Sequence, residues 1–149
     1  MISVGDEQRS IEKTIEHLFR AISFKQGEEP NMHKIKSLFI GEGILINYND
    51  PEPLILPVDE FIVYFNKQFS DGVMTQLEDR EVHAETRIFG RIAHRFSYYE
   101  ARFDESDEKP FAVGVNTIQL MKINDEWKIT SMAWNDDKGE GFSSLPNLN

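Results

Sequence analysis

The sequence predicts an α+β fold in which three N-terminal helices pack in a curved antiparallel sheet. Three observations support this prediction. The first half of the chain contains three amphipathic helical patterns, and the second half contains alternating strand patterns joined by polar turns. One strand pattern, residues 91–103, would span about 43 Å if it were straight. A strand of that length must bend in a chain of 149 residues, and the bend predicts a hollow between the sheet and the helices.

The helical patterns are bounded by capping and breaking residues. Helices are predicted over residues 6–26, 31–39 and 58–69. In the first of them, apolar residues recur at the spacing of one helix face, namely at Ile11, Ile15, Leu18, Phe19 and Ile22. Asp6 and Asp59 are the predicted N-caps of the first and third helices, and Gly27 is the predicted stop of the first.

The strand patterns form a meander in the second half of the chain. Strands are predicted over residues 43–48, 82–89, 91–103, 110–123 and 127–135. The segment Asn49–Pro57 holds three of the six prolines, so it is predicted to be irregular or an edge strand, because proline cannot donate to a ladder. A tight turn at Asn124-Asp125 joins the last two predicted strands. The polar segment Asp104–Lys109 joins the strands predicted over residues 91–103 and 110–123.

Length and composition predict one folded unit. Residues 1–137 are predicted to form a single domain, and residues 138–149, which are rich in glycine and serine, a flexible tail. Hydrophobic residues make up 40% and charged residues 28%, as is usual for globular proteins. Eleven Phe, four Tyr and two Trp predict an aromatic core.

The charge balance argues against nucleic-acid and membrane partners. The chain carries 16 basic and 26 acidic residues, and a net charge of −10 repels both phosphate backbones and anionic lipid. No apolar run approaches the length of about 18 residues that spans a membrane, and the N-terminal residues lack the apolar core of a signal peptide. A cytoplasmic protein is therefore expected.

The histidine and cysteine content argues against metal chemistry. The chain has no cysteine, which excludes disulfides, thiolate catalysis and cysteine–zinc sites. Its four histidines, at positions 17, 33, 83 and 94, show no metal-ligand spacing. Neither a metal nor a cofactor is predicted.

Three segments resemble the nuclear transport factor 2-like superfamily. They are LFIGEGILINYNDP (residues 38–51), RIFGRIAHRFSYYEARF (87–103) and GVNTIQLMKINDEWKITSMAWNDD (114–137). The resemblance covers roughly residues 11–137 and is closest to the SnoaL-like bacterial proteins, whose functions are mostly undefined. It implies a cone-shaped fold, and the superfamily includes ketosteroid isomerase, scytalone dehydratase, limonene epoxide hydrolase and polyketide cyclases.

The resemblance transfers few catalytic residues. Aligned on Phe39, the general-base aspartate of the isomerase falls on Asn47, or on Asp50 if there is a short insertion. The isomerase's helix 1 tyrosine falls near Leu18 or Phe19, neither of which has a hydroxyl group. The arginine and aspartates of the epoxide hydrolase correspond to Ser97, Tyr99 and a position near Trp134, so none is retained. The dehydratase uses histidines, but strand alternation points His83 and His94 away from the hollow.

Strand alternation predicts which side chains line the hollow. With Ile118 taken as inward, alternation also turns Arg95 and Thr130 inward. The predicted ligand-binding wall consists of Tyr48, Tyr64, Phe65, Ser97, Tyr99, Asn116, Met132 and Trp134. A register shift of one residue would invert each strand's set.

Asn116 is the residue of this wall that most needs an explanation. A buried, unpaired amide costs about 1–3 kcal/mol. Three interpretations follow: an internal hydrogen bond in a filled core, a polar contact to a bound ligand, or catalysis. For catalysis, the candidates are Asp50 as the base with Tyr99 or Asn116 as the donor, provided that Asp50 lies in the hollow.

Three classes of function remain open. The first is binding of a small, largely apolar molecule in the pocket. The second is a small-molecule enzyme of the isomerase, dehydratase, cyclase or hydrolase type, and the third is a protein-interaction module. The outer face of the sheet is predicted to pair two copies of the chain in a homodimer, because it carries Val115, Thr117, Gln119 and Met121.

Overall fold

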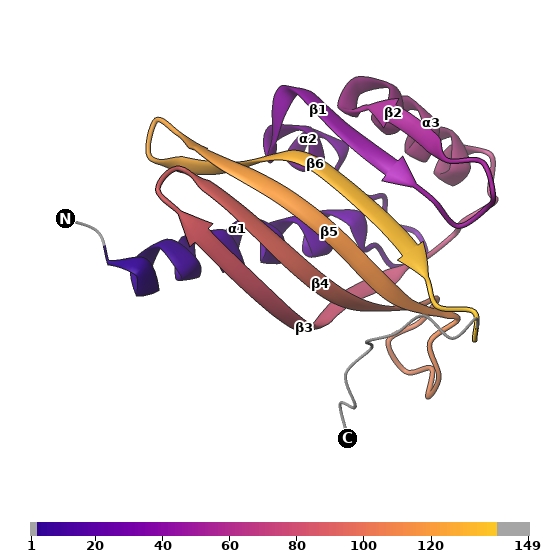
Figure 1. Ribbon diagram of the computed structural model, residues 1–149. Coiled ribbons are helices and arrows are strands. Elements are labelled where there is room, and N and C mark those ends of the chain that lie inside the picture. Colours follow the sequence, from indigo (N-terminus) through magenta and orange to yellow (C-terminus); the bar gives the residue numbers. More distant parts are fainter. Residues whose placement is uncertain (1–2, 140–149) are drawn as a thin grey trace.

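The computed structural model describes residues 3–139 of the chain (Figure 1). Its elements in chain order are α1 (Val4–Ile22), α2 (Met32–Ser37), β1 (Phe39–Asn47), β2 (Leu54–Pro57), α3 (Val58–Ser70), β3 (Glu78–Phe89), β4 (Ile92–Arg102), β5 (Ala112–Ile123) and β6 (Glu126–Asp136). Most of the tail predicted over residues 138–149 lies outside the described residues.

The strands form one mixed sheet in the order β2-β1-β6-β5-β4-β3. The pairs are antiparallel except for β1 and β6, which run parallel. The prediction of a purely antiparallel sheet is therefore wrong at this pair, because a strand pattern indicates which residues face the core and not the direction of a distant partner. The proline-containing β2 lies at one edge of the sheet, as predicted.

Three helices are present in the described residues, but they do not form one N-terminal block. The strands β1 and β2 lie between α2 and α3. Figure 1 shows the sheet curving over α1, with α2 and α3 beside β1 and β2. The helix α1 packs against β3 and β6, whereas α3 packs against β1 and β2. The face of the sheet covered by α1 is called the concave face below.

The predicted helix caps are partly wrong. The N-cap of α1 is Ser3, whose Oγ accepts a hydrogen bond from the Asp6 backbone N–H at 3.1 Å. Asp6 instead lies in the first turn of α1, where the helix dipole stabilises a negative charge. The N-cap position of α3 is Pro57, without a side-chain cap, and Asp59 forms an ion pair with Lys36 at 2.8 Å.

The sheet bends at register shifts in the strands beside β4. The ladder between β4 and β5 is continuous. The ladder between β3 and β4 shifts between Glu81 and His83, and the ladder between β5 and β6 shifts between Gln119 and Leu120. These bulges supply the bend that the length of residues 91–103 requires.

The turn at Asn124-Asp125 is confirmed. Both residues have positive φ, 51° and 65°, as the central residues of a tight hairpin turn between twisted strands do. No helix within residues 3–139 is long and apolar enough to cross a membrane.

The core lies between the concave face and the helices. Its most deeply buried apolar side chains come from the helices and from β1, β5 and β6, and include Ile11, Ile15, Leu18, Ile35, Leu45, Ile118 and Ile129. The predicted apolar stripe of α1 is buried in full.

Candidate functional site

Strand alternation on β4 and β5 is confirmed. Arg95, Ser97 and Tyr99 of β4 and Asn116 and Ile118 of β5 are all at most 7% exposed. Tyr98 is also only 5% exposed, so burial alone does not assign the face; strand pairing puts these five residues on one face, and Ile118, which lies in the core with α1, identifies it as the concave one. This places five of the residues singled out by alternation where the sequence predicts them.

The alternation of β6 is broken at Thr130. The register shift makes Ile129 rather than Thr130 the residue paired with Leu120, and Ile129 is fully buried. The Thr130 hydroxyl donates to the Gln119 carbonyl at 3.2 Å. The prediction that Thr130 faces inward is wrong because one bulged residue reverses the alternation before it. After the bulge, Met132 is buried as predicted.

Two cross-strand rows cross the concave face. In the first row, Gly114 of β5 pairs with Tyr99 of β4 and with Asp136 of β6. In the second row, Asn116 pairs with Ser97 and with Trp134. Directly opposite residues have side chains close enough to touch, so each row is a local cluster.

The first row holds a hydrogen-bonded tyrosine and carboxylate. The Tyr99 hydroxyl donates to Asp136 Oδ1. Burial, together with this bond, raises the pKa of Tyr99, so the hydroxyl stays protonated and acts as a donor. A Cβ at Gly114 would lie 2.5 Å from the Tyr99 hydroxyl oxygen, so only glycine leaves room for the tyrosine to cross β5.

A buried ion-pair network is centred on Arg95 of β4, next to the Ser97 row. Arg95 Nε and Nη2 donate to the two Glu81 carboxylate oxygens at 3.1 and 2.5 Å, and Nη1 donates to Thr86 Oγ1 at 2.6 Å. The Ser97 hydroxyl donates to Glu81 Oε2 at 2.6 Å. Because the Arg95 charge is matched and its donors are engaged, this network holds β3 to β4 and leaves little capacity for a ligand.

Asp79 is the carboxyl group with the most altered acidity. The residue as a whole is half-buried, but its Oδ1 is fully buried and has no hydrogen-bond partner. Burial, and secondarily the charge of Asp136, raises the pKa of Asp79 to about 7. Its backbone N–H donates to Ser23 Oγ at 3.0 Å, which ties the start of β3 to the end of α1.

A groove of about 710 Å³ lies between α1 and β3. Its α1 wall includes Glu12, Glu16 and Arg20, and its sheet wall includes Asp79 and Glu81. None of the eight residues predicted to line the pocket lines this groove. The groove opens between α1 and β3, and the eight predicted residues lie outside its lining.

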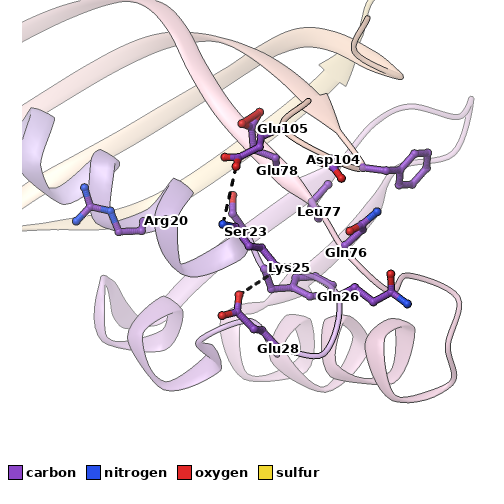
Figure 2. A pocket seen from close by; sticks show the side chains of 12 residues that line it. Arg20, Ser23, Lys25, Gln26, Glu28, Gln76, Leu77, Glu78, Asp104 and Glu105 are labelled. Atoms are coloured by element: carbon purple, nitrogen blue, oxygen red, sulfur yellow. Dashed lines mark hydrogen bonds and ion pairs between the residues drawn. The ribbon is translucent and has the colours of Figure 1, made fainter. Parts of the chain in front are cut away.

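A second groove of about 530 Å³ lies beside the C-terminal end of α1 (Figure 2). Figure 2 shows Glu78 and Glu105 on one side and Glu28 on the other. Lys25 lies between them, with its Nζ 3.8 Å from Glu105 and its backbone N–H donating to Glu28 at 3.2 Å. Both grooves therefore carry more acidic than basic residues.

The predicted aromatic closure of the pocket is only partly present. Tyr48 is 50% exposed and Tyr64 is 43% exposed, so these two do not close the interior. Tyr48 follows the last residue of β1, and Tyr64 lies on the side of α3 away from the core. Phe65 is buried in the core. Trp134 is half-buried, and its ring packs edge to face on Phe61 at 6.2 Å.

Asp50 does not meet the condition set for a general base. It is exposed in the loop between β1 and β2, where water surrounds the carboxylate. Asn47, the other candidate for that position, accepts a hydrogen bond from the Asn49 backbone N–H at 3.0 Å. The Asn49 side chain accepts from the Asp136 backbone N–H at 2.6 Å, so this loop fastens the end of β6.

Three carboxylates of the concave face were missed by sequence reasoning. Asp136 could have been found, because it lies two residues after Trp134 and therefore on the same face. Asp79 and Glu81 precede the bulge at Val82, and no local signal in the sequence marks that bulge. Arg95 forms its ion pair with Glu81, a partner that strand alternation alone could not identify.

Comparison with known proteins gives a match at the level of structure. No family model matches the chain, and no curated protein matches it. A protein of unknown function with a cystatin-like fold from Nostoc punctiforme is 14% identical with a TM-score of 0.70, over 97% of each chain. An NTF2-like protein of unknown function from Pseudomonas putida is 11% identical with a TM-score of 0.70, over 98% of this chain and 100% of the other.

A third solved structure has a named activity. It is a candidate scytalone dehydratase from Novosphingobium aromaticivorans, which is 13% identical with a TM-score of 0.67 over 87% of this chain and 83% of the other. At these identities the similarity establishes the fold. The chain has the nuclear transport factor 2-like α+β fold, as its sequence predicts.

Proposed function

We propose that this protein binds a small, largely apolar molecule on the concave face of the sheet, with one polar group of the molecule held by Asn116. The supporting observation is the state of the Asn116 side chain. The residue is 3% exposed, and its side-chain amide forms no hydrogen bond with the other described residues, although its two polar atoms are not among the fully buried, unpaired ones. A ligand group that bonds to this amide would add about 0.5–1.5 kcal/mol to the binding free energy.

The neighbours of Asn116 suit a ligand that is mostly apolar. Its partner across β4, Ser97, donates to Glu81, and its partner across β6, Trp134, packs on Phe61. Neither neighbour engages the amide. Pockets for small molecules are usually apolar with a few placed polar groups, which is the composition of this row.

The fold supports the same class of function. Curved sheets over helices leave hollows, and the groove between α1 and β3 is one of them, although Asn116 does not line it. The likeness to a candidate scytalone dehydratase adds support for a site that accepts a small organic molecule. For the third class of function, a protein-interaction module, the described residues offer no specific partner-binding feature.

The test is a ligand screen with a matched pair of variants. The full chain is screened by thermal shift against small aromatic and aliphatic carbonyl, alcohol and amide compounds. Asn116→Leu removes the amide on the concave face, and Gln119→Leu removes an exposed amide on the opposite face of the same strand. Stabilisation that is lost in Asn116→Leu and kept in Gln119→Leu is expected; stabilisation equal in both variants, or none with any compound, would contradict the proposal.

Proton-transfer catalysis is the second candidate, favoured by Asp79. A carboxyl group whose pKa is about 7 can both accept and donate a proton at neutral pH. The hydroxyl of Tyr99, a candidate from the sequence, donates to Asp136, and the charge of Asp136 in turn raises the pKa of Asp79. Turnover of a carbonyl or epoxide compound that is lost in Asp79→Asn and kept in Asp50→Asn would support this role; turnover unchanged by Asp79→Asn would exclude it.

A further inference from the structure

Phe103 and Phe111 form an exposed aromatic pair at the base of the loop between β4 and β5. Their rings stack with centroids 4.3 Å apart and an interplanar angle of 17°, and each residue is 51% exposed. Among the described residues, this is the one ring pair in which both members are exposed. About half of each side chain stays in water, although aromatic side chains gain the most from burial.

The backbone around the pair holds it in place. The Phe111 N–H donates to the Ala101 carbonyl at 2.8 Å and closes the base of the loop. Within the loop, Arg102 Nε donates to the Asp107 carbonyl at 2.9 Å, and the Asp107 N–H donates to the Asp104 carbonyl at 3.0 Å. A surface that is already ordered loses little entropy when another group packs on it. The pair is therefore a preformed platform for an apolar side chain.

The end of β6 brings the chain back to this pair. The Asp137 N–H donates to the Val113 carbonyl at 2.7 Å and so continues the ladder between β5 and β6 beyond its last pair. Extending the same register two residues further puts Gly139 opposite Phe111. Gly139 has a φ of 78°, so the chain turns at this point. Figure 1 shows the loop between β4 and β5 beside the end of β6.

The ten residues that follow Gly139 contain enough apolar side chains to cover the pair. Residues 140–149 read EGFSSLPNLN, and the apolar ones are Phe142, Leu145, Pro146 and Leu148. Only Glu140 is charged in this segment, whereas 28% of the whole chain is charged. The acidic residues of the loop between β4 and β5 therefore repel little of it.

Phe142 is the first of these apolar residues, and it lies within reach of the pair. Two residues, Glu140 and Gly141, separate it from Gly139, and each residue of an extended chain adds about 3.3 Å. So short a link gives the ring an effective concentration near the pair on the order of millimolar. A contact too weak to join two separate molecules can therefore hold this segment.

We propose that residues 140–149 dock on the exposed pair of their own chain, with the Phe142 ring packed on Phe103 and Phe111. In this arrangement the third ring covers the open side of the stack and leaves water itself. Contacts between aromatic rings add to what burial alone contributes. The same chain is favoured over a second molecule as the source of the ring because the segment starts opposite Phe111.

Docking on this pair also covers a groove. Phe103 lines the groove of about 530 Å³ at the C-terminal end of α1, together with the apolar residues Phe24 and Leu77. Asp104 and Glu105, which follow Phe103 in the chain, line the same groove (Figure 2). The segment anchored on Phe103 lies along this rim and limits access to the groove from the side of the loop.

The test compares the full chain with three single variants. Phe111→Ser removes half of the platform, and Phe142→Ser removes the anchor. Phe89→Ser is the matched control, because Phe89 is the last residue of β3 and is 84% exposed. Phe89 and Phe111 both lie at the surface, so their variants should keep the fold.

Backbone order parameters from ¹⁵N relaxation are the main measurement. The value for Phe142 should exceed about 0.6 in the unaltered chain and in Phe89→Ser, and should fall below it in Phe111→Ser. Chymotrypsin cleavage after Phe142 should be about tenfold faster in Phe111→Ser than in Phe89→Ser, because docking protects the bond. Phe142→Ser and truncation after Gly139 should both shift the backbone signals of Phe103 and Leu77.

Three outcomes would overturn this inference. In the first, Phe142 has a low order parameter in the unaltered chain, as the flexible tail expected from glycine and serine content would. In the second, the order parameter stays high in Phe111→Ser, so the segment docks elsewhere. In the third, the order parameter rises with protein concentration, which assigns the contact to a second copy of the chain. None of these measurements involves a ligand, so each outcome leaves the proposed function standing.

Discussion

The Tyr99 hydroxyl donates its hydrogen bond to Asp136 across an intervening strand, and Gly114 is the residue over which it passes. The three residues form one row on β4, β5 and β6. The tyrosine covers the position where β5 has no side chain, and its hydroxyl bonds to a carboxylate that would otherwise be partnered by water. This row forms one side of the candidate binding site, and Asn116 begins the next.

Gly114→Ala should destabilise the fold by about 1–3 kcal/mol. The added methyl group would meet the Tyr99 hydroxyl and the backbone of β6, with the Asp136 Cα at 2.8 Å. Backbone atoms cannot move aside as a flexible side chain can. Urea unfolding measures the change, and Gly41→Ala on β1 is the control because nothing lies within 4 Å of its Cβ. Equal effects of the two substitutions would contradict the described packing.

Asn116→Leu should stabilise the unliganded protein by about 1 kcal/mol. Leucine has a similar volume and removes an amide that no residue of the described chain satisfies. Chemical denaturation gives the free energy of unfolding for this variant and for Gln119→Leu, which should differ little from the wild type. A loss of more than about 1 kcal/mol in Asn116→Leu would mean that the amide is bonded in the folded protein.

The contribution of Asp79 to the stability of the protein should fall as the pH rises from about 4 to about 7. The pKa of Asp79 is about 7 in the folded protein and near 3.9 in an unfolded chain, so the folded state binds more protons between these values. Asp79→Asn should therefore be more stable than the wild type at pH 8, by on the order of 2–4 kcal/mol, with the gain shrinking towards pH 4.

The pH dependence is measured by urea unfolding at pH 4, 6 and 8. Asp50→Asn, which removes one exposed charge from the loop between β1 and β2, is the control and should change the free energy of unfolding by less than about 0.5 kcal/mol. A gain in Asp79→Asn that is the same at pH 4 and pH 8 would show that Asp79 is ionised throughout.

Breaking the Arg95–Glu81 pair should cost about 3–5 kcal/mol, because it leaves a buried charge alone. The variants are Arg95→Met and Glu81→Gln, measured singly and together by urea unfolding. The double variant should be less destabilised than the sum of the two single variants. Glu16→Gln, which breaks the exposed pair between Arg20 and Glu16, should cost less than about 0.5 kcal/mol. Similar costs for both pairs would contradict the burial of Arg95.

We propose that two copies of the chain pair through the convex face of the sheet. Val113, Val115, Thr117 and Met121 are half-buried there, and Phe96 and Ala133 lie on neighbouring strands. Sedimentation at micromolar concentration should show a species of twice the 17.3 kDa chain mass, and Val115→Lys should shift it to one chain. A single species near 17.3 kDa for the unaltered protein would exclude this pairing.

Much of the fold could be predicted from the sequence, because its signals are local. The apolar stripe of α1, the positive-φ turn at Asn124-Asp125 and the alternation of β4 each depend on residues close together in the chain. The parallel pairing of β1 with β6 depends on segments at opposite ends of the chain. No local pattern indicates the direction of such a partner.

The candidate site could be predicted only in part, and bulges explain the difference. Ser97, Tyr99 and Asn116 were placed correctly, because β4 and β5 pair without a shift. Asp79 and Glu81 precede a bulge, and Thr130 lies in one. Strand alternation that is extended across a bulge assigns the residues beyond it to the wrong face of the sheet. The surface position of Tyr64 depends on how α3 is rotated against β1 and β2, which the helix pattern does not determine.

The most direct test of the binding claim is an NMR titration that follows the Asn116 side-chain amide. The full chain, labelled with ¹⁵N, is titrated with each compound that raises its melting temperature. The Asn116 amide signals should shift with saturation, together with the backbone signals of Tyr99 and Trp134, while those of the Gln119 side chain stay in place. Shifts confined to the convex face or to exposed loops, with Asn116 unmoved, would contradict a site on the concave face.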